Sequence, residues 1–352
     1  VLRCRRGVRF HFGETSLLNT SELLHADTLF SALTNVYALA YDAAEEWVEH
    51  VRDGRIRVSS GLHCAELSWR PEPVFFVPRP PLRYAAAADD PSAAKRLRHL
   101  RYVSMGVLAE MQAHLQPAPA PDAVPACTLD LLALPRIGGG YACTEAELAP
   151  VLGRDLPPDR LYTTQTLPRV QVRTATVEDN FYHAAGLAPA TVDLPDGRSI
   201  RGHFYVLVEH SLDEQAWQRF LACVRLLADE GIGGERTAGY GWFEAVQPVS
   251  APVPAASGPA PLVLSLSPVI PADENEFASA LRYDLFVRGG GSLGKRGDPE
   301  MHRQRVRMLR EGALFRGPVR GRLVDVSPEE NPLPHPLLRS GINFPLPLGP
   351  VA

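Results

Sequence analysis

The glycine-rich segment 231–244 carries the clearest chemical signal in the sequence, because it places an arginine among glycines. Five glycines occur in eleven residues, at positions 231, 233, 234, 239 and 241. Such a turn can adopt positive φ and lets the backbone approach a ligand closely. Its successive N–H groups can cradle phosphate oxygens, and Arg236 can add a bidentate hydrogen bond. The composition predicts a phosphate-binding loop and leaves open a flexible connector that binds nothing.

Two histidines, His11 and His25, offer a base and an acid for catalysis. Metal-independent RNA cleavage needs a base for the 2′-hydroxyl and an acid for the leaving oxygen. A histidine on the polar face of a strand and a histidine just before a helix are also common in non-catalytic proteins. No further acid partner stands out in the sequence, so we favour the non-catalytic interpretation.

Two further basic segments could contact phosphate. Gly289-x-x-x-x-Gly294-Lys295 approaches a P-loop, but Arg296 replaces the Ser or Thr that would bind Mg²⁺ and Gly297 follows instead of a helix. We reject a nucleotide site there and expect a surface loop that can still touch RNA or a partner. In residues 167–174, Arg169 and Arg173 lie in a predicted β-hairpin. They either face nucleic acid or carry charge on an ordinary solvated strand edge.

The five cysteines exclude two further kinds of site. They show no C-x-x-C pair and no spacing shared with histidines that would hold a metal: Cys4, Cys64, Cys127, Cys143 and Cys223. We therefore expect no metal, no cofactor and no disulfide framework, as in a reducing cytoplasm. No stretch approaches the ~18 apolar residues of a membrane span, and the first residues do not resemble a signal peptide.

The formal net charge of −4 is unusual for a free-standing nucleic-acid binder. The cations are nevertheless clustered, at 3–9, 95–101 and 295–310, and nearly all are arginines. We expect one basic face on an otherwise acidic body, which suits a subunit whose other surfaces meet protein. An arginine preference inherited from a GC-rich genome explains the scarcity of lysine equally well.

Strand and helix patterns position these residues. Residues 1–12 alternate as a strand, with Val8, Phe10 and Phe12 on an apolar face; the opposite, basic face carries Arg3, Arg5, Arg9 and His11. After a loop, Asp27 or Thr28 is placed to cap a helix that runs to Tyr41.

The second half of this unit appears far downstream. A β-rich run at 204–208 precedes a capping-box pattern, Ser211-x-x-Glu214, which opens a helix that Gly231 ends. A short strand, 242–246, follows the glycine-rich loop. This order of strand, helix, strand, helix, glycine-rich loop and strand is ferredoxin-like, so we expect an α+β fold.

The domain prediction follows from the connectors. An N-terminal domain, 1–250, would hold an insertion at about 60–200, and the Pro-rich stretch 251–261 would be a linker. A smaller domain, 262–352, would contain strands at 262–266, 281–287 and 321–326. A helix would start at Asp298, with Pro299 at its first position. Because both halves of the β-α-β pattern precede the linker, the N-terminal piece is expected to fold alone.

Two motifs resemble those of a known group of proteins. Residues 24–33 (LHADTLFSAL) look like the start of the first helix in the RAMP superfamily of CRISPR proteins. Residues 231–243 are similar to its hallmark loop, G-I-G-G-(K/E)-R-(S/T)-x-G-x-G-x-F. Within the superfamily the chain most resembles the fourth subunit of the type III-A (Csm) interference complex. Three further stretches carry that resemblance: 77–80 with 95–105, 312–315 and 334–347.

The resemblance implies a function. It implies two ferredoxin-like (RRM-like) domains without nuclease activity that hold the 5′ handle of crRNA for antiviral defence. The partners implied are crRNA, the large polymerase-palm signature subunit and a backbone RAMP subunit, with target RNA reached indirectly. The alternative is a metal-independent crRNA-processing endoribonuclease, since related RAMP proteins do this chemistry.

The resemblance also implies which residues touch RNA. Motif positions imply contacts from the glycine loop and from the start of the first helix: Gly233, Gly234, Arg236, Thr237, Gly239, His25, Asp27 and Thr28. The motif allows Lys or Glu at position 235, where a lysine is common; Glu235 therefore removes one cation near the expected phosphates. In the wider group a hairpin like 167–174 forms a thumb against the guide RNA. With the basic strand face, this adds Arg9, His11, Arg169 and Arg173 as candidates.

Overall fold

The two distant halves of the predicted β-α-β unit lie side by side in one sheet, where β1 pairs with both β15 and β17. In this computed structural model the described residues are 1–13, 16–85, 90–120, 122–150, 155–157, 160–171, 180–246, 248–254, 261–292, 301–330 and 333–350. The sheet has the order β11-β9-β10-β6-β4-β3-β15-β1-β17, with β14 paired to β15. Its strands are β1 (Leu2–Cys4), β3 (Leu62–Leu67), β4 (Val74–Pro78), β6 (Tyr102–Ser104), β9 (Arg136–Ile137), β10 (Tyr141–Ala142), β11 (Asp155–Leu156), β14 (Thr191–Asp193), β15 (Ser199–Tyr205) and β17 (Phe243–Val246).

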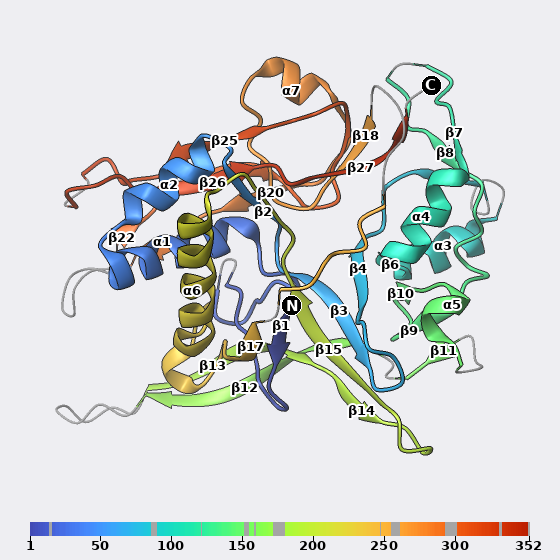
Figure 1. The fold of residues 1–352 in the computed structure, drawn as a ribbon, viewed down its shortest axis with the longest axis horizontal. Coiled ribbons are helices and arrows are strands. Elements are labelled where there is room, and N and C mark those ends of the chain that lie inside the picture. Colours follow the sequence, from blue (N-terminus) through green and yellow to red (C-terminus); the bar gives the residue numbers. More distant parts are fainter. Residues whose placement is uncertain are drawn as a thin grey trace.

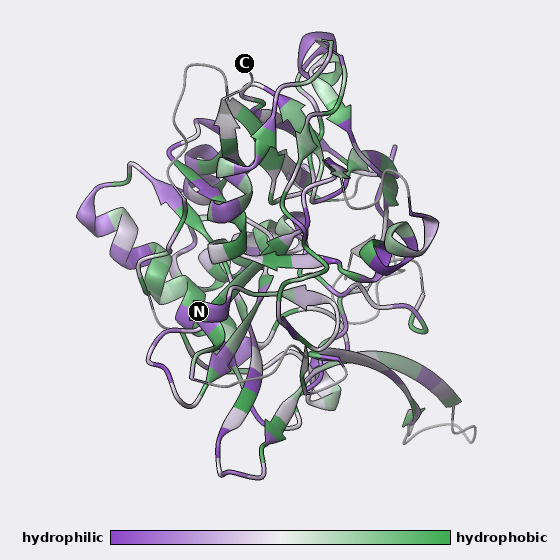
Figure 2. Ribbon diagram, turned by 90° about the vertical axis from the view of Figure 1, so that its right-hand side faces the viewer, coloured by the Kyte–Doolittle hydropathy of each residue, from purple (hydrophilic) through white to green (hydrophobic). Residues whose placement is uncertain are grey.

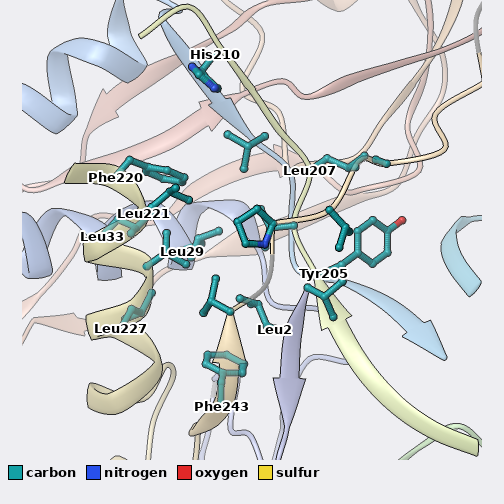
Figure 3. A pocket seen from close by; sticks show the side chains of 18 of the residues that line it. Leu2, Leu29, Leu33, Tyr205, Leu207, His210, Phe220, Leu221, Leu227 and Phe243 are labelled. Atoms are coloured by element: carbon teal, nitrogen blue, oxygen red, sulfur yellow. The ribbon is translucent and has the colours of Figure 1, made fainter. Parts of the chain in front are cut away.

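Helices α1 (Ala26–Tyr41) and α6 (Glu214–Glu230) pack beside each other next to these strands (Figure 1). Leu29 and Leu33 of α1 and Leu227 of α6 face strand residues across an apolar cavity of about 370 Å³ (Figure 3). The observed N-caps differ from the predicted ones by two or three residues. The N-cap of α1 is His25, and the side chain of Asp213 caps α6. Gly231 ends α6 as predicted, with φ 77°.

The prediction of one continuous strand over residues 1–12 is wrong. Gly7 has φ 79° in a turn after β1, which breaks the alternation. Beyond the turn, Phe10 and His11 form single bridges to Leu187 and Gly234. His11 is consequently buried beside Phe10 and Phe12 instead of sharing an exposed basic face with the arginines.

The insertion is built into the main sheet, because β3, β4, β6, β9, β10 and β11 all come from it. It also holds α3 (Pro91–His99), α4 (Met105–Ala113), α5 (Glu145–Leu148) and a small sheet of β5 (Arg83–Tyr84), β8 (Ala126–Cys127) and β7 (Leu115–Gln116). The hairpin predicted at 167–174 is confirmed and is longer: β12 (Tyr162–Gln171) pairs antiparallel with β13 (Asn180–Pro189). Figure 1 and Figure 2 show it projecting from the body of the molecule.

The C-terminal part adds a second sheet of order β19-β24-β18-β27, and its expected strands are confirmed, with 281–287 divided between two strands. The start of the predicted helix, Asp298 and Pro299, lies outside the described residues, but its continuation is wrong, because residues 301–302 and 306–309 form strands instead. The elements are β18 (Pro261–Ser265), α7 (Glu274–Ala278), β19 (Ala280–Arg282), β20 (Leu285–Arg288), β21 (Gly291–Ser292), β22 (Met301–His302), β23 (Val306–Leu309), β24 (Leu314–Arg316), β25 (Gly321–Asp325), β26 (Leu338–Ile342) and β27 (Pro345–Pro350). Helix α2 (Ala44–Arg52) packs on α1, and β2 (Ile56–Val58) pairs with β16 (Val208–His210).

One hydrophobic core joins the two parts of this α+β chain. Leu264, Leu266 and Ile342 of the C-terminal sheets belong to the same buried cluster as Leu33 of α1. Helix α1 packs against β26. None of the described helices is long and apolar enough to cross a membrane.

Candidate nucleic-acid interface

The glycine-rich loop is an ordered structure anchored on the segment after β1. The backbone N–H of Gly234 donates to the carbonyl of His11 over 2.8 Å, and that of Gly241 donates to the carbonyl of Arg9 over 2.8 Å. Positive φ values recur along the loop: 77° at Gly231, 93° at Gly233, 85° at Gly239 and 85° at Gly241. The flexible-connector alternative does not fit a loop held at both ends by sheet-like bonds.

Most of these glycines serve the loop's own packing. A Cβ atom at Gly233 would lie 2.4 Å from the carbonyl oxygen of His11, and one at Gly241 would lie 2.3 Å from that of Ile232. At Gly239 a Cβ atom would meet nothing within 4 Å. Close approach of a ligand backbone is therefore open at Gly239, while Gly233 and Gly241 are required by contacts inside the protein.

Arg236 begins a single 3-10 turn, Arg236–Ala238, on the exposed side of the loop. Within the described residues, no carboxylate lies within ion-pair distance of its guanidinium. Thr237, in the same turn, is exposed as well. The loop therefore presents an uncompensated cation and a hydroxyl to solvent, as its motif predicts.

The hairpin leans on the other side of this loop. Tyr182 of β13 donates its hydroxyl to Glu235 Oε2 over 2.9 Å, and this bond raises the pKa of the phenol. The guanidinium of Arg169 lies 4.9 Å from the centroid of the buried Tyr240 ring. Glu235, which occupies the position where a lysine is common, thus binds the hairpin. The loop and hairpin together border a hollow of about 840 Å³.

A basic cleft of about 640 Å³ opens where the glycine loop meets α1 and the C-terminal part. Four arginines line it, against two carboxylates, which leaves an excess of two positive charges: Arg236, Arg288, Arg303 and Arg339 against Asp27 and Glu230. Burial, followed by the proximity of Arg339, lowers the pKa of Arg303. Desolvated cations with too few internal counter-ions make this cleft a site for an anion.

Asp27 is the internal counter-ion of the cleft. Its Oδ2 lies 3.0 Å from Nε of Arg288, its Oδ1 lies 3.2 Å from Nη2 of the same residue, and Arg339 Nη1 also bonds to it. Burial would raise the pKa of this carboxyl, but the two arginines hold it below its usual value. The prediction that Asp27 captures phosphate itself is corrected, because its oxygens are buried and already hold the arginines that line the cleft. Thr28 contributes an acceptor to Arg288 Nη2 at 2.8 Å.

Neither histidine is placed to touch RNA. His25 is 1% exposed, and its Nδ1 lies 2.7 Å from Glu311 Oε1. His11 is 4% exposed, and its Nδ1 lies 2.8 Å from the carbonyl of Ala185. The predicted roles of His11 and His25 as phosphate or RNA ligands are corrected, because protein encloses both rings.

The structure describes only one of the two remaining candidates, Arg9 and Arg173. Arg9 is half-buried, and its Nη2 donates to Gln165 Oε1 of the hairpin over 3.3 Å. Arg173 lies outside the described residues.

Sequence reasoning missed Arg288 and Arg339 as cleft residues, since only the packing of β20 and β26 on α1 brings them there. Arg303 belongs to a basic cluster that the sequence shows. The sequence does not show that Arg303 lies beside the glycine loop. Among the described residues, no group of His, Cys, Asp and Glu side chains could hold a metal ion.

Comparisons with known proteins agree on one group. Residues 259–348 match the family model "CRISPR Csm4 C-terminal domain". A curated relative from Methanocaldococcus jannaschii, "CRISPR system Cms protein Csm4", is 22% identical over 277 residues. That match covers 72% of this chain and 66% of the relative, just under two thirds of its length.

Two solved structures share the fold. A chain in the crystal structure of a Csm3-Csm4 subcomplex of the type III-A CRISPR-Cas interference complex has a TM-score of 0.65 at 18% identity, covering 99% of both chains. A chain in the crystal structure of a Csm1-Csm4 cassette with cA4 has a TM-score of 0.52 at 17% identity, covering 98% of this chain and 95% of that one.

Proposed function

We propose that the chain is a type III-A RAMP protein of the Csm4 kind, as its likeness to such proteins suggests. It would bind the 5′ handle of crRNA in an effector complex without cutting it. Its two parts would then correspond to two ferredoxin-like domains, the first carrying the insertion. The basic cleft beside the glycine loop carries this proposal. RNA phosphates supply the anions that the cleft lacks, and the exposed turn at Arg236 offers the first contact.

The proposal excludes catalysis by this chain. A metal-independent nuclease needs an accessible base and acid at the scissile phosphate. His11 and His25 are buried and bonded to protein groups. These observations favour RNA capture over the crRNA-processing activity known for other RAMP proteins.

Two protein partners are proposed by analogy with the solved complexes. Those structures are of a Csm3-Csm4 subcomplex and a Csm1-Csm4 cassette. We infer that this chain likewise docks a backbone RAMP subunit and the large signature subunit, in a soluble ribonucleoprotein of the cytoplasm that meets target RNA only through its guide. An acidic chain with a basic cleft at the glycine loop suits such a shared role.

The test is RNA binding by an arginine variant. Arg236→Ala should weaken binding of crRNA handle RNA by about 1.5–3 kcal/mol, the value of one charge-assisted contact. The slope of log affinity against log salt should fall by about 0.7, one single-strand phosphate's worth. Arg225→Ala removes the same charge from the exposed surface of α6, outside the cleft, and serves as the control. Equal affinities for both variants would sink the proposal, as would repeat-RNA cleavage that is lost in His11→Ala.

A further inference from the structure

A second basic pocket, of about 460 Å³, is formed by the insertion and shares no lining residue with the cleft at the glycine loop. It is bordered by the end of α3, the start of β6, the turn between β9 and β10, and the start of β12. Three arginines and one carboxylate line it, which leaves two positive charges in excess: Arg98, Arg101 and Arg160 against Glu22. The ring of His99 also borders it.

Two of the three arginines are available to an outside anion. Arg101 Nη1 is paired with Glu22 Oε1 at 2.6 Å. Arg98 and Arg160 are exposed and have no ion-pair partner among the residues that the structure describes. Arg98 lies in the last turn of α3, where the helix dipole favours a cation and holds it beside the pocket.

The wall of the pocket is backbone. Gly138 and Gly139 have φ values of 60° and 66°, and a Cβ atom at Gly138 would lie 2.7 Å from the backbone nitrogen of Leu161. Glycine is required here so that this turn can pack against the start of β12. Such a turn brings main-chain groups, instead of side chains, against a ligand.

The aromatic residues of the pocket are already occupied. Tyr102 and Tyr141 stack on each other at 4.8 Å, and Tyr162 stacks on His63 at 3.8 Å. The hydroxyl of Tyr141 lies 2.9 Å from Nδ1 of His63, and that of Tyr162 donates to a backbone carbonyl inside the protein. Because these ring faces are already packed inside the protein, a nucleotide base has no free aromatic face to stack on in this pocket. A phosphate can still bind its arginines and main-chain groups.

Strand β12 links this pocket to the glycine loop. Thr164 borders the pocket, and Arg169, five residues later, lies against Tyr240 of the loop, about 17 Å away along the strand. Between them, Gln165 holds the guanidinium of Arg9. Arg160 just before β12, Arg9 held at Gln165 and Arg169 on the strand thus form a row of cations from the pocket to the loop. Such a row matches the regular charges of a single-stranded nucleic acid better than the scattered charges of an acidic peptide.

We propose that the pocket of Arg98, Arg101 and Arg160 is a second phosphate-binding subsite for single-stranded RNA, used by a stretch of the strand beyond the part held at the glycine loop. This inference rests on the proposed RNA-binding function. It assigns the insertion a role in extending the bound length of RNA.

The experiment is a fluorescence-anisotropy titration of the purified full chain with a labelled single-stranded RNA of about 16 nucleotides, the upper site size for one module. Arg98→Ala/Arg160→Ala should weaken binding at least tenfold. Its salt slope should fall by about 0.7 for each lost contact. Arg52→Ala/Arg225→Ala removes two exposed arginines elsewhere and should change neither.

The outcomes separate this inference from the proposed function. If Arg236→Ala weakens binding while the pocket variant matches its control, the second subsite is wrong and the handle-binding proposal stands. If neither variant weakens binding, both proposals fall. If the pocket variant binds RNA normally but loses binding of a Glu-rich peptide that the wild-type chain retains, the pocket receives an acidic protein segment and the RNA subsite is overturned.

Discussion

His25 and Glu311 are separated by 286 positions in the sequence and form a hydrogen bond of 2.7 Å between Nδ1 and Oε1 in the interior. Ser60 donates its hydroxyl to the same carboxylate oxygen. Burial would raise the pKa of Glu311, but the pairing with His25 and the bond from Ser60 hold it below its usual value. The residue before the first helix is therefore fastened to the C-terminal part by a buried polar contact.

Removing the Glu311 carboxylate should lower the free energy of unfolding. Glu311→Ala leaves His25 buried beside a void without its partner, so we expect the free energy of unfolding to fall by about 3–5 kcal/mol. Glu311→Gln keeps an acceptor for Ser60 and should lose less. Urea denaturation of the purified chain measures both.

The control for this change is an exposed ion pair. Glu209 lies 3.5 Å from Arg57 with its side chain 64% exposed, and Glu209→Ala should cost no more than about 1 kcal/mol. If Glu209→Ala and Glu311→Ala lowered the free energy of unfolding equally, the buried contact would stabilise the fold no more than an exposed ion pair does.

The two parts of the chain should not separate at the linker. Deleting the C-terminal part would uncover α1 where β26 packs and would leave Asp27 without Arg288 and Arg339. We expect residues 1–254 alone to melt well below the full chain or to aggregate, and co-expression with residues 261–352 to restore solubility. The sequence pattern predicts the opposite, since it shows an independent N-terminal unit. A fragment with the melting temperature of the full chain would support that simpler domain map.

The local elements could be predicted, because their signals lie within a few residues. The apolar spacing of Leu29, Leu33 and Val36 predicts α1, and Gly231 predicts the end of α6; both are confirmed. The exposed Arg236 also follows from its loop motif. These features depend on propensities and turn geometry that a short segment determines by itself.

The role of Asp27 could not be predicted, because its partners are 261 and 312 positions away. A carboxylate at the start of a helix looks the same in sequence whether it faces solvent or two arginines. His11 was assigned to an exposed face because alternation was extended through Gly7, where a positive φ turns the chain. The first error comes from tertiary packing and the second from a local turn at Gly7.

Acid should destabilise the fold through two buried histidines. Burial lowers the pKa of His63 from 6.5 to about 3 and that of His203 to about 4. The folded protein then binds fewer protons than the unfolded chain, so protonation favours unfolding. Stability is fully present above pH 6.5 and falls by about 1.4 kcal/mol per pH unit for each histidine, until the folded pKa is reached.

Urea unfolding at about pH 7.5 and about pH 5.5, on either side of the unfolded histidine pKa of ~6.5, should thus show a loss of roughly 2–3 kcal/mol. His63→Asn should be less stable at the higher pH, and its loss between the two pH values should be about half as large. An unchanged pH dependence in this variant would mean that His63 does not titrate on unfolding.

The glycine at the open side of the loop gives a test of shape without charge. Gly239 has φ 85° and Gly197 has φ 82°, and neither would place a Cβ atom within 4 Å of another group. Gly197 lies in the exposed turn between β14 and β15, outside the cleft. Valine at either position should cost about 1–3 kcal/mol of stability from the same backbone strain.

Only Gly239→Val should also weaken RNA binding, by about tenfold or more, because its side chain occupies the space that RNA backbone must enter. Its salt slope should stay near the wild-type value, since no cation is lost. Melting temperatures and RNA titrations of the two variants, compared at equal folded concentration, decide the matter. If both bind RNA as the wild type does, the open side of the loop is not where RNA approaches.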